Sequence, residues 1–194
     1  MNYIGMDIHK QFTFAVVKDE QGIEIAEDKF NNSPEQFTNF LTRFAPEETK
    51  IVIESTGVWE YIYDILEGLK YEVKLANPSK TRAIAEARIK TDSVDASTLA
   101  DLLRGNLVFE SYIPPKEIRR LREITRERRT FVKQTTQIKN QIHAILIKRG
   151  IELGYTTLCD GAILWIKEKL PNDKIMLHYL DLLEFHKKKL TEID

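Results

Sequence analysis

The clearest indication of the fold comes from residues 2–30, NYIGMDIHKQFTFAVVKDEQGIEIAEDKF. Strand-forming apolar residues dominate 3–8, 12–18 and 23–30, and the turn signal DEQG at 19–22 separates the second run from the third. Consecutive strands with such short connections pair antiparallel. This stretch therefore predicts a three-stranded meander.

The residues that follow predict alternating helices and strands. Ser33 and Pro34 are the residue types of a helix N-cap and first turn, and the short apolar run 51–54 is typical of a buried strand. The elements expected after the meander are a helix from 34, a strand at 51–54, a helix at 59–69, a strand at 72–76, and helices at 79–87 and 93–104. This order predicts an α/β fold, a mixed sheet with flanking helices in the ribonuclease H-like arrangement.

A different region begins near Pro114 and Pro115. Residues 116–148 contain no Gly or Pro, so they predict one continuous helix, roughly 50 Å long. Apolar positions recur in alternating steps of three and four from 121 to 145, which is the coiled-coil pattern. Shorter helices are expected at 158–170 and 174–190. The predicted division is 1–112 for the α/β domain, 113–150 for the basic coiled-coil helix, and 151–194 for the helical start of a C-terminal region.

Composition limits the class of protein. The 194 residues are 42% hydrophobic and 30% charged, which excludes a chain disordered throughout. The single cysteine, Cys159, allows no internal disulfide, and no stretch approaches the ~20 apolar residues of a membrane span. We therefore expect a cytoplasmic protein without a membrane partner. The net charge of −1 conceals a basic segment, because residues 116–149 hold eleven Lys or Arg and three Glu, a net of +8.

Four carboxylates occupy positions where a fold can gather side chains into one site. Asp7 and Glu54 each follow an apolar strand, and Asp92 and Asp95 lie three apart at the start of a helix, on one face. Carboxylate oxygens suit Mg²⁺ or Mn²⁺, and such an ion relieves the repulsion between gathered acids. A pair of these ions can drive phosphodiester chemistry. The pattern predicts an Mg²⁺ site, with Mn²⁺ as the alternative ion, at these four residues.

Simpler roles account for some of the same residues. Asp92 can serve as a helix N-cap, with Asp95 completing a capping box. His9 is expected to pack or hydrogen bond locally, with a role in orienting the nearby carboxylate or contacting phosphate as the second possibility. Thr56 and Gly57 are expected to shape the turn that follows the second strand carboxylate rather than to contact a substrate.

Three segments resemble a known family: GMDIHK at 5–10, ESTG at 54–57 and KTDSVDA at 90–96. They are similar to the three motif blocks of the DEDD insertion-sequence transposases, also described as Piv-like invertases or bridge-RNA-guided recombinases. The resemblance covers about residues 1–150 in order and spacing. It implies a RuvC-like domain in which Asp7, Glu54, Asp92 and Asp95 bind Mg²⁺, followed by a coiled coil. It also implies DNA strand cleavage and exchange, with DNA and a structured guide RNA as partners.

The resemblance also implies a C-terminal domain that supplies a serine for covalent strand exchange. No serine follows Ser111 in this sequence. The chain is therefore expected to be a truncated member or an N-terminal fragment, and to be incomplete for recombination by itself.

Basic side chains predict a nucleic-acid surface. Arginine donates two hydrogen bonds to one phosphate, and each neutralised phosphate adds salt-dependent affinity. Too few acids accompany these bases for pairing within the helix to neutralise them. The residues assigned to nucleic-acid binding are Lys10, Lys80, Arg82, Arg88, Lys90, Arg119, Arg120, Arg122, Arg126, Arg129 and Lys133. Arg128 belongs to the same cluster, although it lies within the apolar seam at 121–145.

The seam at 121–145 requires an apolar partner, either a second copy of the chain or the C-terminal helices folding back on it; a homo-oligomer is expected. Three other functions remain open. A stand-alone ribonuclease H-like nuclease or Holliday-junction resolvase would use the same acids for hydrolysis. A non-catalytic fragment would only bind nucleic acid and dimerise. An actin-like kinase or ATPase is the least favoured, because no Gly-rich phosphate loop is evident.

Overall fold

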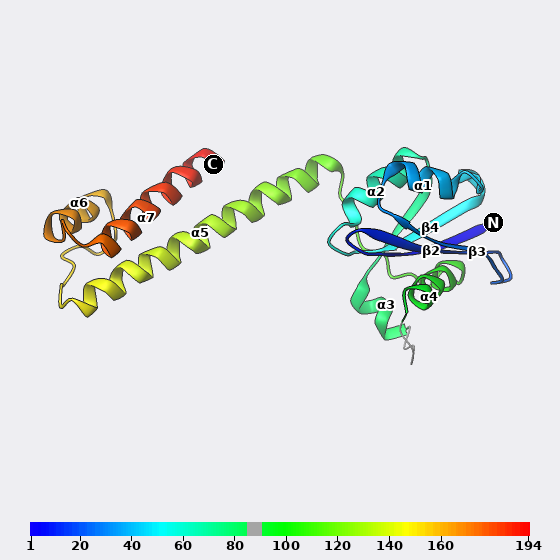
Figure 1. The fold of residues 1–194 in the computed structure, drawn as a ribbon, viewed down its shortest axis with the longest axis horizontal. Helices are drawn as coiled ribbons and strands as arrows, with labels where there is room; N and C mark the ends of the chain where they lie inside the picture. The colour runs from blue at the N-terminus through cyan, green and yellow to red at the C-terminus, as the bar shows by residue number, and fades with distance from the viewer. Residues whose placement is uncertain (85–90) are drawn as a thin grey trace. The chain divides into compact units, whose positions relative to one another are not determined.

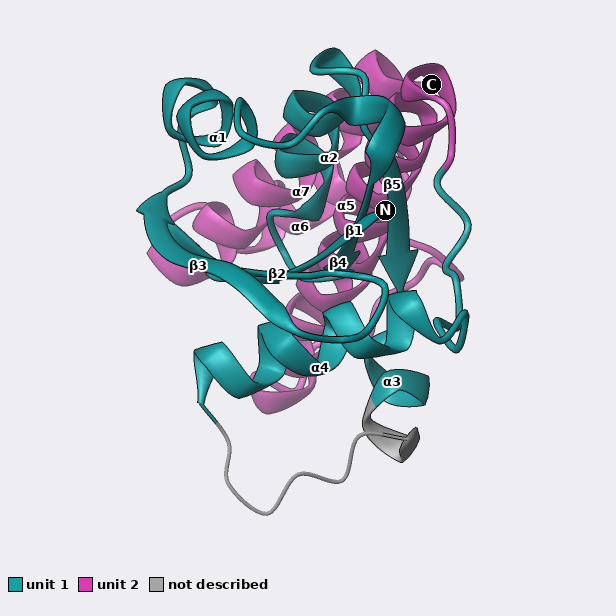
Figure 2. Ribbon diagram, turned by 90° about the vertical axis from the view of Figure 1, so that its right-hand side faces the viewer, with its two compact units in different colours: residues 1–113 teal, residues 114–194 magenta. Residues whose placement is uncertain are grey.

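A computed structural model of the chain describes residues 1–84 and 91–194, which form two compact units, 1–113 and 114–194 (Figure 2). Unit 1 contains one five-stranded sheet in the order β3-β2-β1-β4-β5. Its strands are β1 (Asn2–Ile8), β2 (Phe12–Lys18), β3 (Glu24–Asn31), β4 (Thr49–Glu54) and β5 (Glu72–Ala76). β1, β2 and β3 pair antiparallel, whereas β4 and β5 run parallel to β1. This topology confirms the predicted mixed sheet of the ribonuclease H-like arrangement.

Helices cover both faces of this sheet (Figures 1 and 2). α1 (Pro34–Leu41) and α2 (Trp59–Gly68) lie on one face, and α4 (Asp92–Arg104) packs against β1, β2 and β4 on the other. The short elements η1 (Pro46–Glu48) and α3 (Pro78–Ile84) complete unit 1. The last part of the helix expected at 79–87 lies outside the described residues.

Alternation along the strands assigns each side chain to a face. The core on the α1 and α2 face contains buried residues of all five strands and of both helices: Ile4, Met6, Ile8, Ala15, Val17, Phe30, Ile51, Ile53, Leu75, Phe37, Phe40, Leu41, Ile62 and Leu66. The opposite face carries a smaller cluster, in which Val52 and Ala76 pack against Leu99 and Leu103 of α4.

Gly5 allows α4 to approach β1 closely. A Cβ atom at this position would lie 2.0 Å from the carbonyl oxygen of Ala96 and 2.5 Å from the amide nitrogen of Ala100. The backbone of α4 therefore occupies the space that any side chain on residue 5 would need. At the far end of the helix, the buried Lys18 of β2 donates to Asp101 at 2.5 Å.

Unit 2 is helical, with α5 (Lys116–Lys148), α6 (Asp160–Lys169) and α7 (Lys174–Ile193). Ile138, Ile142 and Leu146 of α5 are buried in one cluster with residues of α6 and α7. The C-terminal half of the apolar seam is thus covered from within the chain. In its N-terminal half, Leu121 is 58% exposed and Ile124 is 40% exposed. None of the helices in the described ranges is both long enough and apolar enough to span a membrane.

The Gly5→Ala substitution is expected to destabilise the chain by about 3 kcal/mol or more, because the new methyl group overlaps backbone atoms that cannot rotate away. Urea unfolding measures this change. Gly68→Ala is the matched control, since a Cβ built there meets no described atom within 4 Å apart from its own stretch of helix and its chain neighbours. Its helical position predicts a neutral or slightly stabilising effect. Equal unfolding midpoints for the two variants would contradict the close packing of α4.

Candidate metal centre

Two strands bring the first pair of carboxylates to the same edge and face of the sheet. In the parallel pairing of β1 with β4, Met6 lies opposite Ile53, so Asp7 and Glu54 are each one position further along. Strand alternation places Asp7 on the face of Gly5 and Glu54 on the face of Val52, which is the face that α4 covers. The sequence alone predicted this neighbourhood from the strand ends.

The first turn of α4 supplies the other pair. Thr91 is the N-cap, because its hydroxyl accepts the hydrogen bond from the Val94 amide at 3.2 Å. The alternative in which Asp92 caps the helix is therefore wrong. Asp92 and Asp95 instead stand in the first turn, where the helix N-terminus favours negative charge. Their carboxylates are not needed to satisfy the capping position.

His9 joins the cluster at the end of β1. Its Nε2 atom lies 3.0 Å from Oδ2 of Asp7 and 3.2 Å from Oδ1 of Asp92. One ligand atom from each of these three residues lies within 4.8 Å of the others. This local hydrogen bonding is the role that the sequence favoured for His9, and the contact with Asp7 is also compatible with its second possible role, that of orienting the carboxylate. The sequence marked His9 by its position two residues after Asp7, within the GMDIHK segment at 5–10.

Neighbouring side chains hold the imidazole in place. The ring of His9 stacks on Phe12, with centroids 4.4 Å apart, and Asn32 donates to the His9 carbonyl at 2.7 Å. Lys29 lies 3.9 Å above the centroid of the Phe12 ring and 3.9 Å from Oδ2 of Asp92. Two groups that can carry positive charge thus face the same carboxylate.

The electrostatics of Asp7 are those of a crowded, partly buried acid. Burial raises the pKa of its carboxyl group above the ordinary value of 3.8, and the negative charges of Asp95 and Asp92 raise it further. The nearby His9 opposes this rise. All three acids therefore belong to one electrostatic cluster. A divalent cation bound among them would reverse the balance and favour the charged form of Asp7.

The donor set fits a divalent metal ion. Asp7 and Asp92 offer oxygens at the cluster itself, and Asp95 is close enough to influence the same carboxyl group. Glu54 is assigned to this site from the register of β1 and β4 alone. Oxygen donors suit Mg²⁺ and Mn²⁺, and the imidazole of His9 suits Mn²⁺ better than Mg²⁺.

Comparison with known proteins identifies the family of the chain. A family model described as a transposase, the DEDD transposases of the IS110 type, matches residues 4–148. The chain belongs to this transposase family. The match includes Asp7, Glu54, Asp92 and Asp95 within its bounds.

A relative of this IS110-type chain is the transposase for insertion sequence element IS1533 of Leptospira borgpetersenii, 26% identical over 159 residues. The alignment covers 80% of the chain and 46% of the relative, so the chain spans about half the length of that protein. A solved structure of T. thermophilus RuvC in complex with a Holliday junction substrate aligns with 57% of the chain and 99% of RuvC. Its sequence identity is 12% and its TM-score is 0.39.

The basic residues of this transposase chain differ in their exposure. On α5 the side chains of Arg120, Arg122, Arg126, Arg128, Arg129 and Lys133 are exposed, whereas Arg119 is buried and does not present its guanidinium to a polyanion. Lys10 is exposed in the turn after β1, and Lys80 lies 5.3 Å from the ring centroid of Phe109. Arg88 and Lys90 lie outside the described residues, and the side chain of Arg82 is not described.

The Asp7→Asn substitution is expected to raise the unfolding temperature at pH 7 in the presence of EDTA. A folded-state pKa above 3.8 means that the folded state holds the proton more tightly than the unfolded state does. The contribution of Asp7 to stability therefore falls as pH rises from 3.8 through the folded-state pKa. The neutral amide avoids that penalty. The difference in unfolding temperature should therefore shrink as the pH approaches 4. Asp28→Asn, at an exposed position of β3, is the control; an equal effect there would contradict a special environment at Asp7.

Proposed function

We propose that this chain is the metal-dependent nuclease part of a DNA transposase that mobilises an insertion sequence. The observation that carries the proposal is the convergence of Asp7, Asp92 and His9, with Asp95 in the same electrostatic cluster, in a chain that belongs to a transposase family. In this proposal the substrate is DNA, and the reaction is strand cleavage and exchange.

Asp7, Glu54, Asp92 and Asp95 are the proposed ligands of Mg²⁺, with Mn²⁺ able to replace it. Bound metal ions would activate the attacking oxygen and stabilise the leaving oxygen of a phosphodiester. The residues of the protein position the carboxylates and balance part of their charge. α4 and the strand ends hold the carboxylates, and the Lys29 ammonium offsets part of their negative charge before metal binds.

The exposed arginines of α5 are the proposed contact with nucleic acid. Arg122, Arg126 and Arg129 follow one another in steps of four and three, so they lie along one side of the helix. Guanidinium groups at this spacing suit successive phosphates. We include a structured guide RNA beside DNA among the proposed partners, because the motif resemblance implies one.

Strand exchange is proposed to need a second component. The chain spans about half the length of the Leptospira relative, and the motif resemblance places a nucleophilic serine in a C-terminal domain. The carboxylate centre is therefore proposed to act together with that serine rather than to complete recombination alone.

The exposed N-terminal half of the seam is a proposed contact between two copies of the chain. Leu121 and Ile124 of the seam are 58% and 40% exposed, and Ile118, which precedes the seam by three residues on the same side of α5, is 41% exposed. The other half of the seam already packs on α6 and α7. Sedimentation of the chain across micromolar concentrations should show a concentration-dependent dimer, and Leu121→Glu should abolish it. A monomer at every concentration would contradict this contact.

The metal site is tested by calorimetric titration with Mn²⁺. The wild-type chain is expected to bind Mn²⁺, and Asp92→Asn or Asp95→Asn should weaken binding at least about tenfold, since each removes a charged ligand or near neighbour. Glu48→Gln is the matched control, because Glu48 is an exposed acid before β4, at the opposite end of that strand from Glu54. Equal affinity in all variants would contradict the site. Retained DNA binding without any Mn²⁺ uptake would favour a non-catalytic binding fragment.

The α5 surface is tested by salt-dependent DNA binding. Replacing Arg122, Arg126 and Arg129 together with Gln should weaken binding to all sequences. It should also reduce the slope of log affinity against log salt by roughly 0.9 for each lost phosphate contact. The control replaces Lys169, Lys174 and Lys188 with Gln, which removes the same charge from exposed positions of α6 and α7. The same loss in both variants would indicate a nonspecific effect of net charge.

A further inference from the structure

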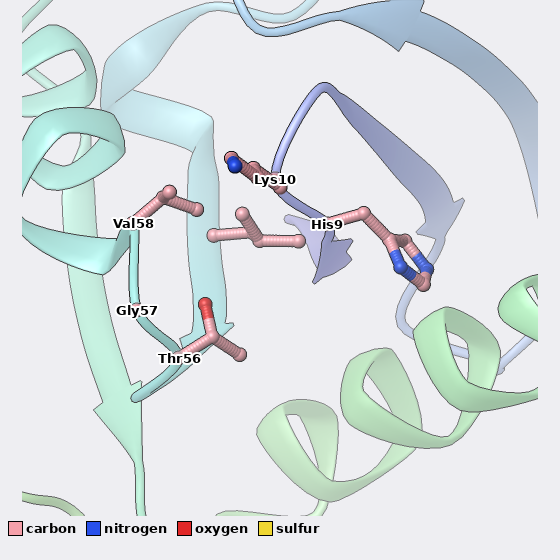
Figure 3. Close-up of a pocket in the computed structure, with 6 residues that line it drawn as sticks. His9, Lys10, Thr56, Gly57 and Val58 are labelled. Atoms are coloured by element: carbon pink, nitrogen blue, oxygen red, sulfur yellow. The ribbon is translucent and has the colours of Figure 1, made fainter.

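A cleft lies beside the carboxylate cluster, at the edge where β1 and β4 end. Its volume is about 330 Å³, and its lining comes from the end of β1 with the turn that follows it and from the loop between β4 and α2: Ile8, His9, Lys10, Thr56, Gly57 and Val58. Figure 3 shows His9 and Lys10 leaving the β1–β2 turn in opposite directions. His9 lines the cleft and also contacts Asp7 and Asp92. The cleft and the proposed metal centre are therefore adjacent.

Thr56 has an unsatisfied polar atom at this cleft. Its Oγ1 atom is buried and has no hydrogen-bond partner among the described residues. Figure 3 shows this oxygen directed toward the β1–β2 turn, into the space between the two loops. A buried hydroxyl normally finds a partner, and one that lacks it within the protein is suited to a ligand oxygen. The expectation that Thr56 only shapes the turn does not account for this atom.

Two further lining residues contribute to the cleft: Lys10 supplies a cation, and Gly57 leaves its peptide backbone accessible. Lys10 is exposed and forms no ion pair with any residue whose side chain is described, in 1–81 and 91–194. Gly57 is exposed, and no described atom lies within 4 Å of a Cβ built on it. The cleft is thus lined by an exposed positive charge, a buried hydroxyl without a partner among the described residues and an accessible peptide, together with the apolar side chains of Ile8 and Val58.

This combination matches the chemistry of a nucleotide. A phosphate needs the cation, a sugar or phosphate oxygen can pair with the hydroxyl, and the apolar surface suits a deoxyribose or the face of a base. A free inorganic anion would make no use of the apolar walls. The position of the cleft, next to the cluster proposed to act on a phosphodiester, suits the neighbouring nucleotide of the same strand.

We propose that this cleft binds the nucleotide adjacent to the phosphodiester held at the carboxylate cluster. Lys10 contacts the phosphate of that nucleotide, and Thr56 Oγ1 hydrogen bonds to one of its oxygens. This assignment rests on the proposed nuclease function; it gives Lys10, already assigned to nucleic-acid binding, a specific phosphate, and it adds Thr56 as a substrate-positioning residue. These two contacts would orient the DNA across the ends of β1 and β4.

The test is a titration of the ¹⁵N-labelled chain with a thymidine tetranucleotide, followed by amide NMR at low salt without divalent ions. Amides of Lys10, Gly57 and Val58 are expected to shift. Lys10→Gln should weaken the fitted affinity about tenfold, and Thr56→Val about fivefold, as for the loss of one charged and one neutral hydrogen bond. Thr56→Ser keeps the hydroxyl and should restore binding. The controls Lys50→Gln and Thr42→Val lie away from the cleft and should bind as the wild type does.

Two results would overturn the proposal: shifts confined to α5, or affinities unchanged in both cleft variants. Line broadening of the Asp92 and Asp95 amides, measured after Mn²⁺ is added to the same samples at the end of the titration, separates this inference from the function on which it rests. If Mn²⁺ broadens the Asp92 and Asp95 amides but the tetranucleotide does not shift the cleft amides, the nucleotide assignment alone is overturned. Absence of both effects overturns the metal centre as well. The spectra also report whether each variant is folded.

Discussion

The contact between Gly5 and α4 is the constraint on which the rest of unit 1 depends. The helix backbone lies where a side chain of residue 5 would be, so α4 sits directly on the central strand rather than on a layer of side chains. Asp95 precedes Ala96, whose carbonyl makes this contact, and Asp7 follows Gly5 by two residues on the same face of β1. The close packing of two backbones therefore sets how near the helix and strand carboxylates can come.

This proximity has an electrostatic cost that the local structure partly offsets. Burial and the charges of Asp92 and Asp95 disfavour the ionised form of Asp7, as its raised pKa indicates. His9 and Lys29 place positive or potentially positive groups against the same carboxylates. The burial of apolar residues between α4 and the sheet holds the helix in place despite this repulsion. A site that stores repulsion between acids is well suited to take up a cation.

Local sequence signals predicted much of this arrangement and failed where two residues could fill one role. The meander, the crossover strands and the long helix followed from periodicity and turn residues. The N-cap of α4 did not, because Thr91 and Asp92 are both favoured capping residues and stand next to each other. His9 had no spacing signal of its own, so its contact with Asp92 became evident only when the strand end and helix start were brought together.

The sequence by itself determined the secondary structure, the faces of the strands and the apolar seam of α5, because these depend on backbone preferences and on periodicities of two or 3.6 residues. Tertiary structure decided which side chains meet. His9 and Asp92 are separated by more than eighty residues of chain, and only sheet register and the fit of α4 at Gly5 place them within hydrogen-bonding distance. Likewise, periodicity revealed that the seam needs a partner, while only the fold of unit 2 determined that α6 and α7 cover its C-terminal half.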